Sequence, residues 1–253
     1  MIRAESICKN FGGQEVLKNI YCDFEPGKAN LIIGRSGAGK TVLLKILIGL
    51  LQPSSGKVWY DNVDLFSLDK QQLRELRMQI GMLFQGSALF DSMSVEDNIR
   101  FPLDMFSNMS RNEKNDRVNY CLERVNLGGN NKKYPSELSG GMQKRVGIAR
   151  AIVLQPKYLF CDEPNSGLDP KTSIVIDELI YSITRENNII TIINTHDMNS
   201  VMEIGDNIFL LHEGELAWSG NKDEVLASDN QTLESFMFAS PFLQKLKSKF
   251  IEH

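Results

Sequence analysis

The spacing of apolar and polar positions changes several times along this chain of 253 residues. Residues 1–33 alternate short apolar runs with the turn signals GG and PG, which predicts short strands. The apolar run NLIIG (residues 30–34) predicts a buried strand, and VLLKILIGLL (42–51) predicts the helix that follows it. The stretch SSGKVWYDNVDL (54–65) is typical of a turn, a strand and a second turn.

The pattern becomes mainly helical and more charged over residues 69–151, as in LDKQQLRELRMQI and NEKNDRVNYCLERVNL. Strands and helices then alternate: YLFCDEP, a helix near 174–187, IITIINTHD, a helix near 198–204, and NIFLLHEGELAWSG. This alternation predicts α/β layers around a largely parallel sheet, interrupted by a mainly helical insert. The tail, residues 232–253, has a helical pattern with apolar residues exposed at its end.

Composition excludes several classes of function. A net charge of −4 argues against general nucleic-acid binding and against attachment to anionic lipid by charge. There is no apolar stretch of signal-peptide type, and the longest apolar run is far shorter than the ~20 residues of a membrane span. We therefore expect a cytoplasmic protein, with any membrane role provided by a partner. Four scattered cysteines form no CxxC pair and are expected to be reduced and buried or idle: Cys8, Cys22, Cys121 and Cys161.

A phosphate-binding loop is predicted between the strand at 30–34 and the helix after it. The stretch GRSGAGKT fits G-x-x-x-x-G-K-[ST] in the strand–loop–helix context that this motif requires, which disfavours a chance glycine-rich turn. Its glycines allow successive N–H groups to converge on phosphates at a helix start. We expect Lys40 to reach the β- and γ-phosphates and the Thr41 hydroxyl to ligate Mg²⁺. The predicted ATP-binding loop comprises Gly34, Arg35, Ser36, Gly37, Ala38, Gly39, Lys40 and Thr41.

The second half of a nucleotide site is predicted at KYLFCDEP (157–164). Its continuous apolar run is the pattern of a strand buried on both faces, and it delivers Asp162 and Glu163 to the carboxyl end of the sheet. Asp162 is expected to hold Mg²⁺, and Glu163 to polarise an attacking water. Alone, DE after an apolar run is more often a strand cap, but its pairing with the loop at Gly34 favours the nucleotide site.

A second anion site, without a lysine of its own, is predicted at LSGGMQKR (138–145). Ser139 is expected to cap a helix, and Gly140 and Gly141 to leave the first backbone N–H groups accessible. Such a receptor makes sense if another copy of the chain supplies Lys40 and the metal, whereas LSGG in isolation reads as an ordinary capped helix. The helix has one apolar face, formed by Val146, Ala149, Ile152 and Val153.

Together these motifs resemble those of the nucleotide-binding subunits of ABC transporters, and the likeness covers nearly the whole chain. LSGGM resembles the family signature, with Met142 where glutamine is commonest. Phe11 matches the aromatic residue that stacks on adenine, and Gln85 matches the glutamine that senses metal and water and reports to the membrane partner. Asp169, in NSGLDP, matches the loop that communicates across the dimer, and His196, in INTHD, matches the switch histidine at the γ-phosphate.

The resemblance implies an α/β fold: a P-loop NTPase (RecA-like) core with an antiparallel β sub-domain and a helical sub-domain, as in ABC ATPases. It implies an ATPase domain over residues 1–231, a helical sub-domain at about 86–155 and a C-terminal helical extension over 232–253. It also implies a homodimer with two Mg²⁺-ATP at its interface. The implied catalytic residues are Glu163, His196, Gln85 and Lys40; the metal ligands are Thr41, Gln85 and Asp162; the contacts to the partner's ATP are Ser139, Gly140, Gly141 and Asp169.

Simpler explanations stay open for single residues. Phe11 alone would more often belong to a core, and His196 could be just the polar end of a strand. Asp169, followed by Pro170, reads equally well as the N-cap of the next helix. Asn165 replaces the threonine that is common before SGLD, and we expect little effect from this difference.

The stretch GSALFDSMSVEDNIRFPL (86–103) resembles that of ATPases of MCE-type, Mla-like lipid transporters. This implies phospholipid transport between the inner and outer membranes, with a permease docked in a groove near Gln85 to Phe101 and an MCE-domain protein in the complex. It places the subunit on the cytoplasmic face of the inner membrane. In that family the C-terminal extension crosses to the opposite subunit; here it could equally fold back on its own domain. The residues considered as an anchor are Phe236, Phe238, Phe242 and Leu246.

Rival functions make different demands on the sequence. An ABC ATPase of iron–sulfur cluster assembly shares the core but binds scaffold proteins, and an ABC importer for another substrate shares all the ATP-site motifs. DNA-repair relatives need a longer insert than residues 41–138 provide, and translation-factor relatives carry two cores in one chain. A small-molecule P-loop kinase would explain neither LSGGM nor His196. No nucleic-acid partner is expected.

Overall fold

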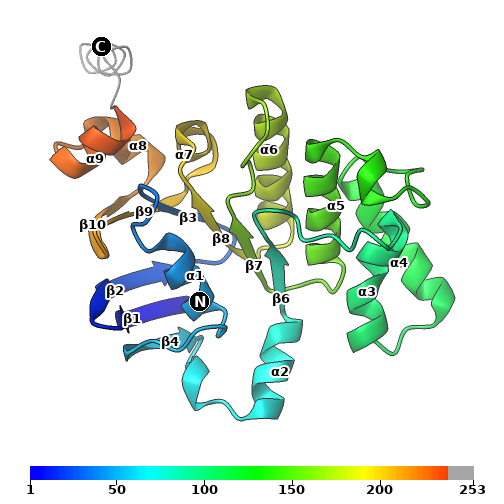
Figure 1. Ribbon diagram of the computed structural model, residues 1–253, viewed down its shortest axis with the longest axis horizontal. Coiled ribbons are helices and arrows are strands. Elements are labelled where there is room, and N and C mark those ends of the chain that lie inside the picture. The colour runs from blue at the N-terminus through cyan, green and yellow to red at the C-terminus, as the bar shows by residue number, and fades with distance from the viewer. Residues whose placement is uncertain (239–253) are drawn as a thin grey trace.

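The computed structural model describes residues 1–238, which fold around two β-sheets (Figure 1). A four-stranded antiparallel sheet has the order β2-β1-β4-β5, and a six-stranded sheet has the order β10-β9-β3-β8-β7-β6. The strands are β1 (Ile2–Phe11), β2 (Gln14–Phe24), β3 (Ala29–Ile33), β4 (Ser55–Tyr60), β5 (Val63–Asp64), β6 (Ile80–Leu83), β7 (Tyr158–Asp162), β8 (Ile190–Thr195), β9 (Asn207–His212) and β10 (Glu215–Gly220).

The described helices surround these sheets, with α3 to α6 gathered on one side of the larger sheet (Figure 1). The α-helices are α1 (Lys40–Leu47), α2 (Lys70–Met78), α3 (Val95–Phe106), α4 (Arg111–Arg124), α5 (Gly140–Ile152), α6 (Pro170–Glu186), α7 (Met198–Ile204), α8 (Lys222–Ala227) and α9 (Gln231–Met237). Two short 3₁₀ helices are η1 (Leu65–Ser67) and η2 (Pro135–Glu137).

The antiparallel sheet departs from the prediction of short strands at the N-terminus. Strands β1 and β2 are 10 and 11 residues long, and alternate residues of β1 are buried from Ile2 to Ala4 before irregular pairing begins. Polar residues on the exposed face break the strand into apparently short apolar runs, although the pairing continues across them.

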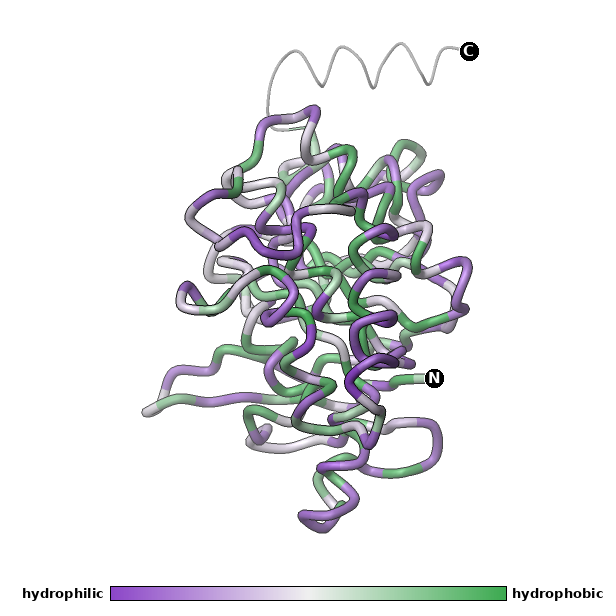
Figure 2. Tube along the Cα trace, turned by 90° about the vertical axis from the view of Figure 1, so that its right-hand side faces the viewer, coloured by the Kyte–Doolittle hydropathy of each residue, from purple (hydrophilic) through white to green (hydrophobic). Residues whose placement is uncertain are grey.

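The larger sheet is parallel from β9 to β6, and β10 pairs with β9 antiparallel. Its central strand β3 is buried along its whole length, as predicted for a continuous apolar run. Leu31 and Ile33 point into a core shared with α3 to α6, while Ile32 points into a second core shared with α1 and the antiparallel sheet. The sheet therefore divides two hydrophobic cores. In Figure 2, hydrophilic residues (purple) lie mainly along the outer turns of the chain.

Helix α6 begins at Pro170, four residues before the predicted start, because the polar turn PKTS already belongs to its first turn. Asp169 caps this helix as predicted, accepting a hydrogen bond from the Thr172 N–H at 3.0 Å. The helix predicted near residues 198–204 is found as α7. Among residues 1–238, no helix combines the length and apolar character needed to cross a membrane.

Of the terminal helical segment predicted over residues 232–253, the described part contains the short helix α9, Gln231–Met237. Phe238 is buried in the core of its own chain, and Phe236 packs against that core. These two residues therefore fit an extension that folds back on its own domain. Phe242 and Leu246 lie outside the described residues.

Candidate ATP site

The predicted catalytic residues meet at the carboxyl ends of four neighbouring parallel strands. The phosphate-binding loop follows β3, Glu163 follows β7, His196 follows β8, and Gln85 lies two residues after β6. The register pairs Ile33 with Thr195 and Asp162 with Asn194, so these strands end level with one another. This edge of the sheet is where ligands bind in open α/β folds.

The phosphate-binding loop has the backbone that its glycines were predicted to allow. Gly34, Gly37 and Gly39 have φ values of 146°, 83° and 103°, in the region that favours glycine. A Cβ at Gly39 would lie 2.7 Å from Leu17 Cδ2, so this position also requires a close approach. The Lys40 ammonium is buried and donates hydrogen bonds to the carbonyls of Gly34 at 2.8 Å and Arg35 at 3.3 Å.

Glu163 is the centre of the polar cluster. Its Oε1 lies 3.7 Å from Lys40 Nζ, and its Oε2 lies 2.6 Å from His196 Nδ1. Its φ of 50° is left-handed, so the backbone turns sharply where the strand ends. His196 is thus more than a polar strand end: it contacts the proposed base.

Asp162 and Thr41 provide oxygen atoms at the same place. Thr41 Oγ1 lies 3.5 Å from Asp162 Oδ1, and the Asn194 amide donates to that same oxygen at 3.1 Å. A hydroxyl and a carboxylate beside a phosphate loop are the ligands that Mg²⁺ takes in nucleotide sites, where it keeps several waters. The donor set of this chain therefore fits a hydrated Mg²⁺ ion.

The phosphate-binding loop, Glu163 and His196 line an open cleft of about 740 Å³, whereas Asp162 is not part of its lining. Its lining includes four residues that the sequence did not assign to the site: Val16, Val42 beside the phosphate-binding loop, and Ser235 and Phe236 of the distant helix α9. The separation of α9 from the motifs along the chain gives no local signal for its contact. The predicted residues that line the cleft are Arg35, Ser36, Gly37, Gly39, Lys40, Thr41, Gln85, Glu163 and His196.

Other predicted residues lie outside this lining. Phe11 is not part of the core, since its side chain is 46% exposed and Lys9 Nζ lies 5.0 Å from its ring centre. Ser139, Gly140 and Asp169 are exposed and do not line the cleft of their own chain. The residues predicted to contact ATP in trans are therefore set apart from those predicted to bind it in cis.

The start of α5 is the second predicted anion receptor. Ser139 is its N-cap, accepting a hydrogen bond from the Met142 N–H at 3.3 Å. Gly141 is buried, and a Cβ there would lie 2.5 Å from Thr172 Cγ2. Thr172 Oγ1 in turn donates to Asp169 Oδ2 at 2.5 Å. Gly141 therefore packs against a residue that is hydrogen-bonded to Asp169.

Asn165 has more contacts than the sequence suggested. Its amide donates to Asp177 Oδ1 at 2.9 Å and to Ser200 Oγ at 3.0 Å, and the Ser200 hydroxyl donates to Asp177 Oδ2 at 2.7 Å. A threonine hydroxyl could donate only one such bond. Burial raises the pKa of Asp177 to about 6, although hydrogen bonds from Ser200 and Asn165 oppose the shift.

Two cations of α5 hold the loop after β6, and no sequence motif predicted a role for them. Lys144 donates to the Gln85 carbonyl, and Arg150 donates to the carbonyls of Ser87 at 2.6 Å and Ala88 at 2.8 Å. Burial lowers the pKa of both side chains. A signal for Lys144 did exist: it shares the buried stripe of α5 with Ile148 and Ala151 at helical spacing.

The segment predicted to receive the permease, Gln85 to Phe101, mixes buried and exposed residues, and Phe84 lies just before it. Phe84 and Phe90 are each more than 40% exposed, and the Phe90 and Phe101 ring centres lie 5.0 Å apart. The buried Asn98 side chain fixes this segment, accepting from the Phe90 N–H at 2.8 Å and donating to the Phe90 carbonyl at 3.1 Å. The segment therefore holds one exposed phenylalanine, Phe90, whose main chain is fixed by hydrogen bonds to Asn98.

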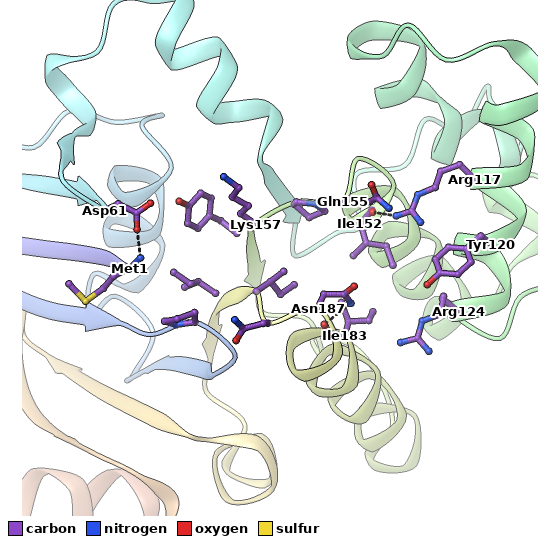
Figure 3. Close-up of a pocket in the computed structure, with 16 residues that line it drawn as sticks. Met1, Asp61, Arg117, Tyr120, Arg124, Ile152, Gln155, Lys157, Ile183 and Asn187 are labelled. Atoms are coloured by element: carbon purple, nitrogen blue, oxygen red, sulfur yellow. Dashed lines mark hydrogen bonds and ion pairs between the residues drawn. The ribbon is translucent and has the colours of Figure 1, made fainter.

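Another cleft, of about 460 Å³, opens near the opposite ends of the parallel strands (Figure 3). Two of its cations are already occupied, because Arg117 donates to the carbonyls of Ile152 and Val153 and Arg124 pairs with Glu186 at 2.6 Å. None of the predicted site residues lines this cleft. The sequence motifs therefore indicate the cleft around Glu163, and not this one, as the chemical site.

The chain matches known proteins over most of its length. The family model described as ABC transporter matches residues 17–166. The protein named "Probable ribonucleotide transport ATP-binding protein mkl" of Mycobacterium leprae (strain TN) is 38% identical over 236 residues, covering 93% of this chain and 68% of the relative. "Methionine import ATP-binding protein MetN 1" of Pseudomonas putida is 37% identical over 229 residues, covering 89% and 68%. The chain thus spans about two thirds of these relatives.

Two solved structures have the same fold. The ATP-binding cassette MJ0796, described as a dimer in a post-hydrolysis state bound to ADP and Pi, has a TM-score of 0.80 at 31% identity and covers 88% of this chain and 99% of its own. The cbiO1 protein of Clostridium perfringens, described as part of the complex cbiONQ, has a TM-score of 0.84 at 31% identity and covers 98% of both chains. The predicted fold class is therefore confirmed.

Proposed function

The chain belongs to the ABC transporter family and is an ATPase, and on that premise we propose that it drives a transporter of phospholipid. The observation that carries the motor role is the meeting of Lys40, Glu163 and His196 in one cleft, where the Glu163 carboxylate lies 3.7 Å from Lys40 Nζ and 2.6 Å from His196 Nδ1. A cation, a carboxylate base and a histidine at a phosphate loop are the groups that phosphoryl transfer to water requires.

In the proposed reaction, Glu163 orients and polarises the water that attacks the γ-phosphate in line. Lys40 and His196 bind the phosphate oxygens on which charge develops. Both side chains contact Glu163 in the structure, so the γ-phosphate competes with the carboxylate for them. This exchange frees the Glu163 oxygens for water once the nucleotide is in place.

Mg²⁺ would be held by the Thr41 hydroxyl, the Asp162 carboxylate and the Gln85 side chain, and it would neutralise charge on the phosphates. Asn194 holds Asp162 in position by donating to its carboxylate. Gln85 donates to Ser166 Oγ at 3.4 Å, which ties the loop after β6 to the loop after β7. The Gln85 side chain thus lies where a change at the phosphates can be passed to the segment after it.

The proposed active form is a homodimer. Ser139, Gly140 and Asp169 are exposed away from the chain's own cleft. Backbone N–H groups at a capped helix start attract anions, and the start of α5 brings no cation of its own. Two chains packed head to tail would set each α5 start against the γ-phosphate bound by the other chain's Lys40.

The segment from Gln85 to Phe101 is the proposed groove for a membrane permease. Binding to this permease would hold the subunit at the cytoplasmic face of the inner membrane. The likeness of residues 86–103 to MCE-type ATPases supports phospholipid as cargo and an MCE-domain protein as a further partner. The names of the relatives point to other cargo, since one names ribonucleotide transport and the other methionine import. The choice of cargo is therefore the part to test first.

The test is to purify the tagged full chain from its own membranes in mild detergent and to identify the partners by mass spectrometry. ATPase activity of the complex is then measured with phospholipid, methionine or ribonucleotides added, and Glu163→Gln serves as the hydrolysis-deficient control. We expect a permease, an MCE-domain protein and stimulation by phospholipid alone. A permease with no MCE-domain protein and stimulation by methionine or ribonucleotide would refute lipid transport, and capture of scaffold proteins without a permease would refute a transporter altogether.

A further inference from the structure

Lys144 is a buried cation that touches two catalytic loops at once. Its side chain is 4% exposed, and its ammonium donates to the main-chain oxygens of Gln85 and of Glu163, the latter at 3.3 Å. Burying an ammonium costs free energy unless hydrogen bonds and opposite charge compensate it. Here the compensation comes from the backbone of two residues, Gln85 and Glu163, that line the ATP cleft.

The helix that carries Lys144 is fixed against the strand that leads to Gln85. A Cβ at Gly147 would lie 2.7 Å from Leu83 Cδ1, and a Cβ at Gly81 would collide with the Ala151 carbonyl oxygen. The helix and the strand therefore pack closely at both glycines. Arg150 adds two hydrogen bonds to the loop, at Ser87 and Ala88, both of which have left-handed backbone.

The other end of α5 carries Ser139, Gly140 and Gly141. Lys144 lies about one turn further along the same helix, since a turn holds about 3.6 residues. The helix thus has an exposed tip suited to the partner's nucleotide and, one turn later, a cation bound to its own chain's catalytic loops. Figure 1 shows α5 beside β6 and β7, between α6 and α3.

We propose that Lys144 is a positioning residue: it fixes the main chain at Gln85 and Glu163, so that the two side chains address the γ-phosphate, and it links the tip of α5 to that geometry. The positioning role needs only the ATPase site. The link to the tip rests on the proposed head-to-tail dimer. A displacement of α5 would move both carbonyls together, because a single ammonium holds them.

The test compares Lys144→Met, Lys144→Arg and Arg145→Met in the purified full-chain complex. Methionine keeps the apolar stem but removes the donor, and arginine restores a charged donor. Arg145 is the matched control, because it also lies on α5 and donates to two carbonyls, those of Val125 and Asn126, away from the cleft. We expect Lys144→Met to lower kcat about 10- to 100-fold while KM for ATP changes less than about 3-fold, since misplacing reacting groups by about 1 Å is enough for such a loss.

Lys144→Arg should recover most of kcat. Arg145→Met should keep kcat near that of the parent, even if its melting temperature falls as much as that of Lys144→Met. A kcat for Lys144→Met within about 2-fold of the parent would overturn the proposal, because a misplaced carboxylate cannot leave the rate unchanged. So would equal losses in Lys144→Met and Arg145→Met, or a rise in KM alone. Sedimentation of Glu163→Gln with ATP reports the dimer separately, so failure of the dimer does not obscure the positioning result.

Discussion

The starts of α1 and α5 are both glycine-rich and both suited to phosphate, but they are built differently. Helix α1 begins after Gly39 with no side-chain cap, and its first residue is the buried Lys40. Helix α5 begins after Ser139, which caps the Met142 N–H within the chain, and it has no charged residue in its first two positions. One start has no N–H capped by a side chain, whereas Ser139 caps one N–H of the other within the chain.

Because of this difference, we expect the starts of α1 and α5 to have different roles in binding ATP. A helix start with uncapped N–H groups and its own ammonium can bind a nucleotide firmly within one chain. A helix start with one N–H already capped by a side chain gains less binding free energy from an anion. It contributes when the partner chain brings its bound phosphate to it. The comparison predicts that damage at α1 affects binding and chemistry alike, while damage at α5 affects turnover in the assembled complex.

The largest effect is expected for Lys40→Ala. Loss of this ammonium removes the charge at the β- and γ-phosphates and one contact of Glu163, so ATP turnover should fall by at least about 100-fold. ATP affinity of the isolated chain should fall as well. Both quantities are accessible by phosphate release and by calorimetric titration of ATP, and unchanged affinity would contradict a role of Lys40 in binding ATP.

A smaller effect is expected for Ser139→Ala, which removes the cap of α5. Stability should fall by about 1 kcal/mol, and turnover of the complex by about 10-fold, since one donor to the partner's phosphate is lost. The matched control is Ser110→Ala, because Ser110 caps α4 in the same way, through the Glu113 N–H at 3.4 Å, and does not line the ATP cleft. Equal turnover losses in the two variants, measured at the same ATP concentration, would show that only stability is affected.

Gly141→Ala should lower turnover only a few-fold, through displacement of the α5 tip. The added Cβ meets Thr172 Cγ2, and overpacking of this kind costs roughly 1–3 kcal/mol. The double variant with Thr172→Ser removes that methyl but keeps the hydroxyl that donates to Asp169, so it should regain both stability and turnover. Denaturant unfolding and phosphate release measure the two; no rescue by serine would exclude the steric explanation.

The smallest effect on turnover is expected for Asp177→Asn. This change alters the hydrogen bonds that Asp177 accepts from Asn165 and Ser200. The pKa of Asp177 is about 6 when folded, above its ordinary value of 3.8, so the folded chain binds more protons than the unfolded chain between these pH values. Its contribution to stability is therefore present at low pH and is lost as pH rises towards 6. Urea unfolding from pH 4.5 to 7 should show a smaller fall in stability with rising pH for Asp177→Asn than for the parent. An unchanged slope would mean that Asp177 ionises normally.

The sequence predicted the parts of the site that depend on local pattern. Lys40, Glu163 and His196 each follow a buried parallel strand, and parallel strands of one sheet end at the same edge, so their meeting could be expected before any coordinates. Asp169 and Ser139 were found as N-caps because a cap depends on the next three residues only.

The contacts that escaped prediction depend on packing between distant segments. Phe236 reaches the cleft from α9, and Asn165 reaches Ser200 on α7, with no pattern that links them. Lys144 looked like one more polar residue in QKR, although its place on the buried stripe was visible. Its partners are main-chain oxygens, which any residue type supplies, so sequence alone could not name them.

Helix α9 gives the ATP cleft a wall that can be used to observe it. Ser235 is exposed on this wall, next to Phe236, and three of the four cysteines are buried, with Cys8 half-buried. Burial raises the pKa of the Cys22, Cys121 and Cys161 thiols, which slows their reaction with maleimides. In a Cys8→Ser background, a dye attached through Ser235→Cys would sit at the mouth of the cleft, where its brightness reports nucleotide arrival and departure in real time.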